Sequence, residues 1–219
     1  ILSGRGEHFS SGADLSNSSN HETSLLKKRR DSRAGEQAIL ALINMDQITI
    51  ASWNGAAMGG GACIATACDF RIGTPTSFMQ YPEIDIGVNL MWKSLPLLIN
   101  LVGPSRSKRL VIGGDRITGE ELHSWGILDK LVAEEELDKE ATLLAEKYAK
   151  KAPLAAQMIK QSTNNIVNAL SNEIMHMDFD QNLFTAQTRD RSTAINSYLD
   201  KTEPDFEGCL LYTSDAAAE

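Results

Sequence analysis

The chain has 219 residues, of which 42% are hydrophobic, so it is long enough and apolar enough to bury a substantial core. It contains no apolar run of membrane-spanning length (about 18 residues) and no pattern of a secretory leader, so we expect no membrane association. Its formal net charge of −8 disfavours nucleic-acid binding as the main activity, because phosphate contacts need clustered lysine and arginine.

The cysteines and the chain ends bear on the cellular compartment of the protein. Cys63, Cys68 and Cys209 cannot all pair with one another and have no zinc-ligand spacing, so we expect no metal site and a reducing compartment. A cytoplasmic location is favoured. The mitochondrial matrix and the peroxisome stay open, because the opening at Ile1 suggests a missing upstream segment. Residues 208–219 are expected to be a non-native tail.

The first part of the chain predicts a loop and a helix. The polar stretch 16–24 and the basic run Lys27–Arg30 that follows it are expected to form one exposed loop. Over residues 34–45, apolar residues such as Ile39 and Leu42 recur at helical spacing, which predicts an amphipathic helix.

The next segment predicts a parallel sheet. Residues 48–51 form a short β-branched run that ends at the turn pair Asn54–Gly55, as expected of a buried strand. Small residues at 62–68 then indicate a helix packed closely on a sheet, and 69–73 returns as a strand. A strand-helix-strand unit of this kind favours parallel pairing.

After Glu83 the pattern is helical, and we predict an α/β core over residues 1–145 followed by a helical region over 146–207. The first helical segment after Glu83 ends near Val102, and Pro104 suits the first turn of the next. The expected helices and caps are 95–102, Pro104–Ile112, a capping box at Thr118–Glu121, 134–150, 154–169, and one or two helices within 171–200.

Three segments could carry chemistry. One, His8–Leu15, is a strand end that breaks into a turn of small residues and by itself indicates only a turn. Gly59–Gly61 opens a helix, where free backbone N–H groups and the helix dipole favour an anion or oxyanion, although glycines there could equally serve close packing. Glu83 and Asp85 stand among apolar neighbours after a strand. Glu83 could be an acid-base group or a salt-bridged structural carboxylate. Asp85 is expected to face the other way along its strand.

The order and spacing of several motifs resemble the crotonase superfamily of enoyl-CoA hydratases and isomerases. The similarity covers nearly all of Ile1 to Phe206. It is carried by Phe-Ser-Ser-Gly-Ala-Asp-Leu at 9–15, Trp53–Gly61, Ala67–Ile72, Pro82–Glu83 and Leu101–Pro104.

The resemblance implies an α/β fold, a crotonase-like spiral of ββα units with a helical C-terminal trimerisation region. It also implies an acyl-CoA thioester as substrate, no cofactor apart from the coenzyme A of that substrate, and assembly into homotrimers or hexamers.

The resemblance also assigns roles to individual residues. The backbone N–H groups of Ala13 and Gly60 match the oxyanion hole that binds the thioester carbonyl, and Glu83 matches the catalytic carboxylate. Lys27, Lys28 and Arg29 could meet the phosphates of CoA or simply be solvated. Substrate contacts are expected from Ser10, Ser11, Gly12, Gly59, Gly61, Cys63, Met91 and Trp92.

One departure from the hydratase pattern bears on the reaction. Hydratases of this superfamily hold water between two glutamates, and the first of these positions is Cys63 here, a thiol that is a poor base for water. Bulky residues at Met91 and Trp92 resemble the isomerase type, although they could equally be core residues of the following helix, and we expect an enoyl-CoA isomerase. A hydratase stays an alternative, as does a domain that binds acyl-CoA or a protein without turnover. Hydrolases and decarboxylases share the same oxyanion hole.

Overall fold

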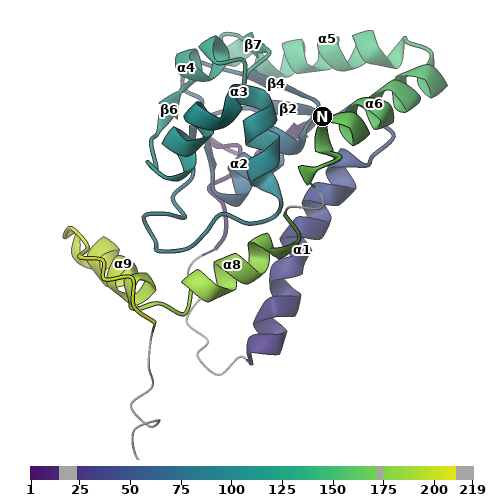
Figure 1. Ribbon diagram of the computed structural model, residues 1–219. Helices are drawn as coiled ribbons and strands as arrows, with labels where there is room; N and C mark the ends of the chain where they lie inside the picture. Colours follow the sequence, from purple (N-terminus) through teal and green to yellow (C-terminus); the bar gives the residue numbers. More distant parts are fainter. Residues whose placement is uncertain (15–23, 172–174, 211–219) are drawn as a thin grey trace, which may run out of the picture.

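The computed structural model describes residues 1–14, 24–171 and 175–210 (Figure 1). In these residues two small sheets form the centre of the molecule and helices pack around them. Helix α8 (Asp178–Thr185) lies against helix α1 (Leu25–Ile43), whereas α9 (Arg189–Asp200) lies apart from α1. The molecule is therefore of the predicted α/β class, with a helical C-terminal part.

The first sheet is entirely parallel, as the sequence predicts. Its central pair joins β2 and β4 in the register Ile50 to Phe70, and every residue of β2 is buried. Burial on both faces explains why β2 reads as a continuous apolar run without alternation. The strand order is β1 (Leu2–Ser3), β2 (Ile50–Trp53), β4 (Phe70–Gly73), β7 (Lys130–Leu131).

The second sheet places the segment around Ser10 beside the glycine motif. β3 (Ala56–Met58) runs parallel to β5 (Phe78–Gln80), and β5 pairs antiparallel with β6 (Ile117–Thr118). Ser10 forms a parallel bridge to Ala57 on the free edge of β3. The residues just after Ser10 therefore lie next to the residues that follow β3.

Helix α1 corrects the prediction of a basic loop. It spans Leu25–Ile43, whereas the predicted helix began at 34, and Ser24 caps it by accepting a hydrogen bond from the backbone N–H of Lys27. Arg29 stacks on the ring of Phe179 and pairs with Asp180 at 2.9 Å. The basic run is thus helical, and its first turns are covered on one side by the C-terminal region.

The helices between Glu83 and Trp125 follow the prediction, whereas two short strands were not predicted. α3 (Ser94–Val111) is broken at Gly103, whose φ of 75° separates two helical halves, and Pro104 opens the second half as expected. Thr118 and Glu121 form the predicted capping box of α4 (Gly119–Ser124). The short strands β6 and β7 were not predicted, because two residues are too few to show a strand period.

The helix that follows the glycine motif is α2 (Gly60–Ala67). The later helices are α5 (Leu137–Ala149), α6 (Pro153–Asn168), α8 (Asp178–Thr185) and α9 (Arg189–Asp200), with short 3₁₀ turns at Glu134–Glu136 and Met175–Met177. Within 175–200 there are two shorter helices, not one long helix. Most of the polar stretch 16–24 and most of the tail at 208–219 lie outside the described residues.

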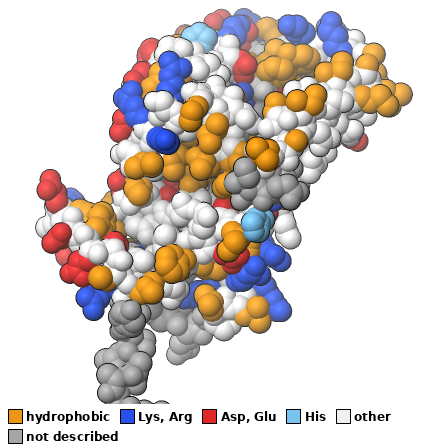
Figure 2. All heavy atoms as spheres, in the orientation of Figure 1, with side chains coloured by type: hydrophobic (Ala, Val, Ile, Leu, Met, Phe, Trp, Pro, Cys, Tyr) orange, Lys and Arg blue, Asp and Glu red, His pale blue; other side chains and the backbone are white. Residues whose placement is uncertain are grey.

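Apolar side chains remain exposed on the helical part. Figure 2 shows them gathered over the end of the molecule that α5 and α6 form in Figure 1. On α6 the exposed ones include Leu154, Met158, Ile159 and Ile166. Across the described part of the chain, every helix is too short or too polar to cross a lipid bilayer.

A buried ion pair attaches α6 to the parallel sheet. The Lys160 ammonium lies 2.8 Å from Oδ2 of Asp69 and donates a hydrogen bond to the carbonyl of Gln47, and its side chain is only 4% exposed. The same Asp69 oxygen accepts hydrogen bonds from the backbone N–H and the hydroxyl of Thr49. Since both charges are largely removed from water, each depends on the other for compensation.

We therefore expect Lys160→Met to lower the free energy of unfolding by about 3–5 kcal/mol, because it leaves Asp69 charged and uncompensated. Lys139→Met is the matched control, since Lys139 is 67% exposed and forms a loose ion pair with Glu136 at 3.8 Å, and it should change stability by less than about 1 kcal/mol. Urea denaturation measures both. Equal effects of the two substitutions would contradict this account of how α6 is attached.

Candidate active site

The predicted oxyanion residues are brought together by the pairing of Ser10 with β3. The N–H of Ser10 donates to Ala56, and the N–H of Met58 donates to the carbonyl of Ser10. Gly12 then turns the chain with a φ of 90°, so close to the end of β3 that a side chain there would lie 2.8 Å from the Met58 carbonyl oxygen. Ala13 consequently enters the space beside the start of α2.

The start of α2 supplies the second donor. Gly59 precedes the helix with a φ of 50°, a conformation that favours glycine, and its own N–H is bound to the carbonyl of Gln80. Gly60 is the first helical residue, so its N–H has no acceptor within the helix and lies at the positive end of the dipole. Ala13 and Gly60 line one cavity of about 570 Å³.

Each of the three glycines also permits a close contact. A methyl group on Gly59 would lie 2.8 Å from Oε1 of Glu83, one on Gly60 would lie 2.5 Å from the ring of Trp92, and one on Gly61 would lie 2.6 Å from the carbonyl oxygen of Ser10. Close packing and access to the backbone, the two interpretations of this motif, are therefore compatible with each other.

Glu83 faces Gly59 from a turn that follows β5. The N–H of Val88 donates to the Glu83 carbonyl at 2.9 Å, which closes the turn. No salt bridge to Glu83 occurs among the described residues, and its Oε2 is buried without a hydrogen-bond partner there. Burial raises the pKa of Glu83 to about 7. The salt-bridged interpretation is therefore not supported, and the carboxyl can both give and take a proton near neutral pH.

Cys63 lines the same cavity one turn into α2. Its side chain is buried, and burial raises the pKa of the thiol to about 12, with a further contribution from the charge of Glu83. The thiol therefore stays protonated at physiological pH. It cannot replace a second carboxylate as a base for water.

Most of the predicted site residues share this cavity. Those that line it are Ser11, Gly12, Ala13, Gly59, Gly60, Cys63, Glu83, Met91 and Trp92. Ser10 and Gly61 are not part of its lining; they pack against each other behind the oxyanion residues. Lys27, Lys28 and Arg29 lie on α1 and do not line it either, so their contact with CoA phosphates stays a prediction.

Several cavity residues were not predicted. They are Met58, Gln80, Pro82, Asp85, Ile86, Leu90 and Tyr198. Asp85 corrects an expectation, because it lies on the turn after β5 and lines the cavity instead of facing away along a strand. Burial raises its pKa. Tyr198 comes from α9, and nothing in the sequence pattern connects α9 with the glycine motif.

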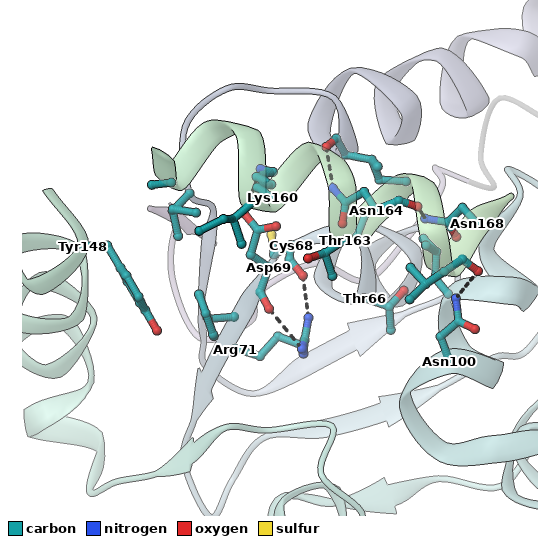
Figure 3. Close-up of a pocket in the computed structure, with 18 of the residues that line it drawn as sticks. Thr66, Cys68, Asp69, Arg71, Asn100, Tyr148, Lys160, Thr163, Asn164 and Asn168 are labelled. Carbon is teal, nitrogen blue, oxygen red and sulfur yellow. Dashed lines mark hydrogen bonds and ion pairs between the residues drawn. The ribbon is translucent and has the colours of Figure 1, made fainter. Parts of the chain in front are cut away.

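A second cavity, of about 610 Å³, lies between α6 and the start of β4 (Figure 3). Several of its polar groups are occupied by the protein itself: Lys160 by Asp69, and Asn164 by the carbonyl of Ile43. None of the predicted site residues lines this cavity. The cavity at the start of α2 is therefore the candidate active site.

Comparison with known proteins agrees with this geometry. The profile of the family described as enoyl-CoA hydratase/isomerase matches residues 1–209. The chain belongs to this family. Among curated relatives, the chain is 28% identical over 207 residues to crotonyl-CoA hydratase of Syntrophomonas wolfei, covering 94% of this chain and 79% of the relative.

Other relatives in the family carry different activities. The chain is 30% identical over 210 residues to 2,3-dehydroadipyl-CoA hydratase of Escherichia coli, covering 95% of this chain and 80% of that protein. It is 32% identical over 166 residues to a peroxisomal Δ(3,5)-Δ(2,4)-dienoyl-CoA isomerase of Arabidopsis thaliana, covering 71% of this chain and 60% of that protein. The family is thus clear; most of these relatives are named hydratases, and one is named a dienoyl-CoA isomerase.

Solved structures show the same fold. The enoyl-CoA hydratase/isomerase of Pseudoalteromonas atlantica superposes with a TM-score of 0.81 at 18% identity, covering 94% of this chain and 79% of that one. Pseudomonas aeruginosa DspI superposes with a TM-score of 0.69 at 28% identity, covering 94% and 78%. The predicted crotonase fold is confirmed.

The pKa of Glu83 predicts a pH-dependent stability. The pKa rises from an ordinary 4.5 to about 7 on folding, so the folded protein binds the proton more tightly than the unfolded chain. The free energy of unfolding should therefore fall by up to about 3 kcal/mol as the pH rises from 4.5 to 7, and be level above that. Urea denaturation of the wild type and Glu83→Gln across this range isolates the effect. An identical pH dependence in both proteins would contradict it.

Proposed function

We propose that the protein is an enoyl-CoA isomerase that moves a double bond by proton transfer through Glu83. The observation that carries the proposal is the environment of this carboxyl: it is buried, has a pKa of about 7, and faces a neutral thiol where a second carboxylate would be needed to hold and activate water.

The mechanism uses three groups of the chain. The ionised Glu83 carboxylate takes a proton from C2 of a 3-enoyl-CoA, and the electron pair of that C–H bond forms a dienolate whose charge rests on the thioester oxygen. The backbone N–H groups of Ala13 and Gly60 donate hydrogen bonds to this oxygen, each contributing about 2.7–4 kcal/mol to transition-state stabilisation. The protonated Glu83 then returns the proton to C4, which leaves the double bond between C2 and C3.

The walls of the cavity support the same reaction. Met58, Leu90, Met91 and Trp92 present apolar surface next to Glu83 and Cys63, which disfavours a bound water in the reaction zone. No cofactor takes part in this proton transfer, and coenzyme A enters only as part of the substrate. The exposed apolar side chains of α6 fit the expected assembly into trimers or hexamers, which light scattering of the purified protein measures.

A second candidate is an enoyl-CoA hydratase. It is favoured by the names of the relatives that are 28–30% identical to this chain. Hydration would require Glu83 to activate water without a carboxylate at the position of Cys63, so we expect it to be slow. A domain that binds acyl-CoA without turnover is a third candidate. It predicts binding without exchange of the C2 hydrogen with solvent.

Glu83→Gln should lower kcat for isomerisation of 3-hexenoyl-CoA by about 100- to 10,000-fold, because the amide cannot accept the C2 proton. Asp85→Asn is the matched control, since it removes a carboxylate that lines the same cavity but has no role in the mechanism, and kcat should change by less than about threefold. Ultraviolet absorbance of the conjugated product measures the rate. Undiminished activity of Glu83→Gln would contradict the mechanism, and crotonyl-CoA hydration faster than isomerisation would favour the hydratase.

A further inference from the structure

Trp92 occupies an unusual position between α1 and the start of α2. Trp92 and Lys93 both have left-handed backbone conformations, with φ of 68° and 55°, which non-glycine residues rarely adopt. Consecutive residues of this kind persist only where the surrounding structure holds them, and they are concentrated at functional sites. The contacts around Trp92 therefore need an explanation.

The indole of Trp92 lies against two glycines. On one side its six-membered ring is so close to Gly60 that a methyl group there would lie 2.5 Å from Cζ3. On the other side a methyl group on Gly35 would overlap Cε2 and Nε1 of the indole. Gly35 stands inside α1, where alanine would favour the helix. The close approach of the indole explains the glycine at this position.

The backbone beside Trp92 is held from two directions. The N–H of Lys93 donates a hydrogen bond to Oδ2 of Asp178, a buried residue at the start of α8. The ammonium of Lys93 pairs at 3.3 Å with Glu36, the neighbour of Gly35. The indole thus cannot retreat toward α1, and its inner face forms part of the cavity wall.

We propose that Trp92, braced against Gly35, is the residue that sets the length of the acyl group, and that it selects short acyl chains. This rests on the proposed function in one respect, that the thioester carbonyl binds at Ala13 and Gly60. From that point the acyl chain extends into a cavity whose wall next to Gly60 is the indole. A smaller side chain at this position leaves the space of an aromatic ring for further carbons.

The test measures the binding of saturated CoA esters, which the enzyme cannot isomerise, by isothermal titration with butyryl-CoA and decanoyl-CoA. The wild type should bind butyryl-CoA more tightly. Trp92→Leu should lower the Kd of decanoyl-CoA by about tenfold or more relative to that of butyryl-CoA. Trp125→Leu is the matched control, because Trp125 lies at the end of α4 outside the cavity lining, and the ratio of the two Kd values should not change.

Gly35→Ala distinguishes an effect of the contact between Gly35 and the indole from a general loss of structure. The added methyl group pushes the indole toward the cavity, so decanoyl-CoA should bind still more weakly than to the wild type. In a Trp92→Leu background the same substitution should have no effect on either Kd, because the overlapping ring is absent. If Trp92→Leu fails to fold, Trp92→Phe, which keeps one aromatic ring and is smaller than the indole, still gives the decisive Kd ratio.

An unchanged Kd ratio in Trp92→Leu, or an equal effect of Gly35→Ala with and without the indole, would overturn the proposal. These outcomes are separate from the fate of the proposed reaction. A protein that binds CoA esters with the predicted selection but does not isomerise 3-enoyl-CoA contradicts only the proposed function. A protein that isomerises but shows no change of selection contradicts only the role of Trp92.

Discussion

The close contact between residues 10–13 and the start of α2 is the constraint on which the candidate site depends. Two backbone hydrogen bonds fix Ser10 along β3, and Gly61 allows the chain to lie directly on the helix. This approach places Ala13 and Gly60 on the wall of one cavity. Because the proposed oxyanion donors are backbone N–H groups, their positions are set by sheet pairing and helix geometry and need no particular side chain at 13.

The chemistry of the cavity follows from burial more than from charge. Glu83 has no cationic partner among the described residues, so removal from water is the leading cause of its raised pKa. The same burial keeps the Cys63 thiol protonated. A carboxyl that titrates near neutrality beside a neutral thiol suits a proton moved between two carbons. It suits the activation of water less well.

The C-terminal helices position the turn that carries this chemistry. Arg191 of α9 donates a hydrogen bond to the carbonyl of Ile86, and Thr185 of α8 accepts one from the N–H of Asn89. Asp178 binds the N–H of Lys93 in the same way. Residues 86–93 are therefore held from outside the sheet domain, which explains how a turn without regular structure can present Glu83, Met91 and Trp92 to one cavity.

Local patterns in the sequence predict part of this arrangement. The glycines before α2, the capping box at Thr118 and the parallel pairing of β2 with β4 follow from residue chemistry over short distances. The grouping of Ala13, Gly60 and Glu83 was predicted only from the resemblance to a family. Tyr198 and the contact of Gly35 with Trp92 were not predicted, because they depend on how distant helices pack. The basic run was misread because its helix is covered by Phe179 and Asp180, far along the chain.

The most direct test of the central claim is the isomerisation of a 3-enoyl-CoA in deuterium oxide, with the product examined by mass spectrometry and NMR. If one enclosed carboxyl carries the proton from C2 to C4, a substantial part of the 2-enoyl-CoA will contain no deuterium at C4, because the proton returns before it exchanges with solvent. A product that is mainly 3-hydroxyacyl-CoA, or a 2-enoyl-CoA fully deuterated at C4, would contradict the account.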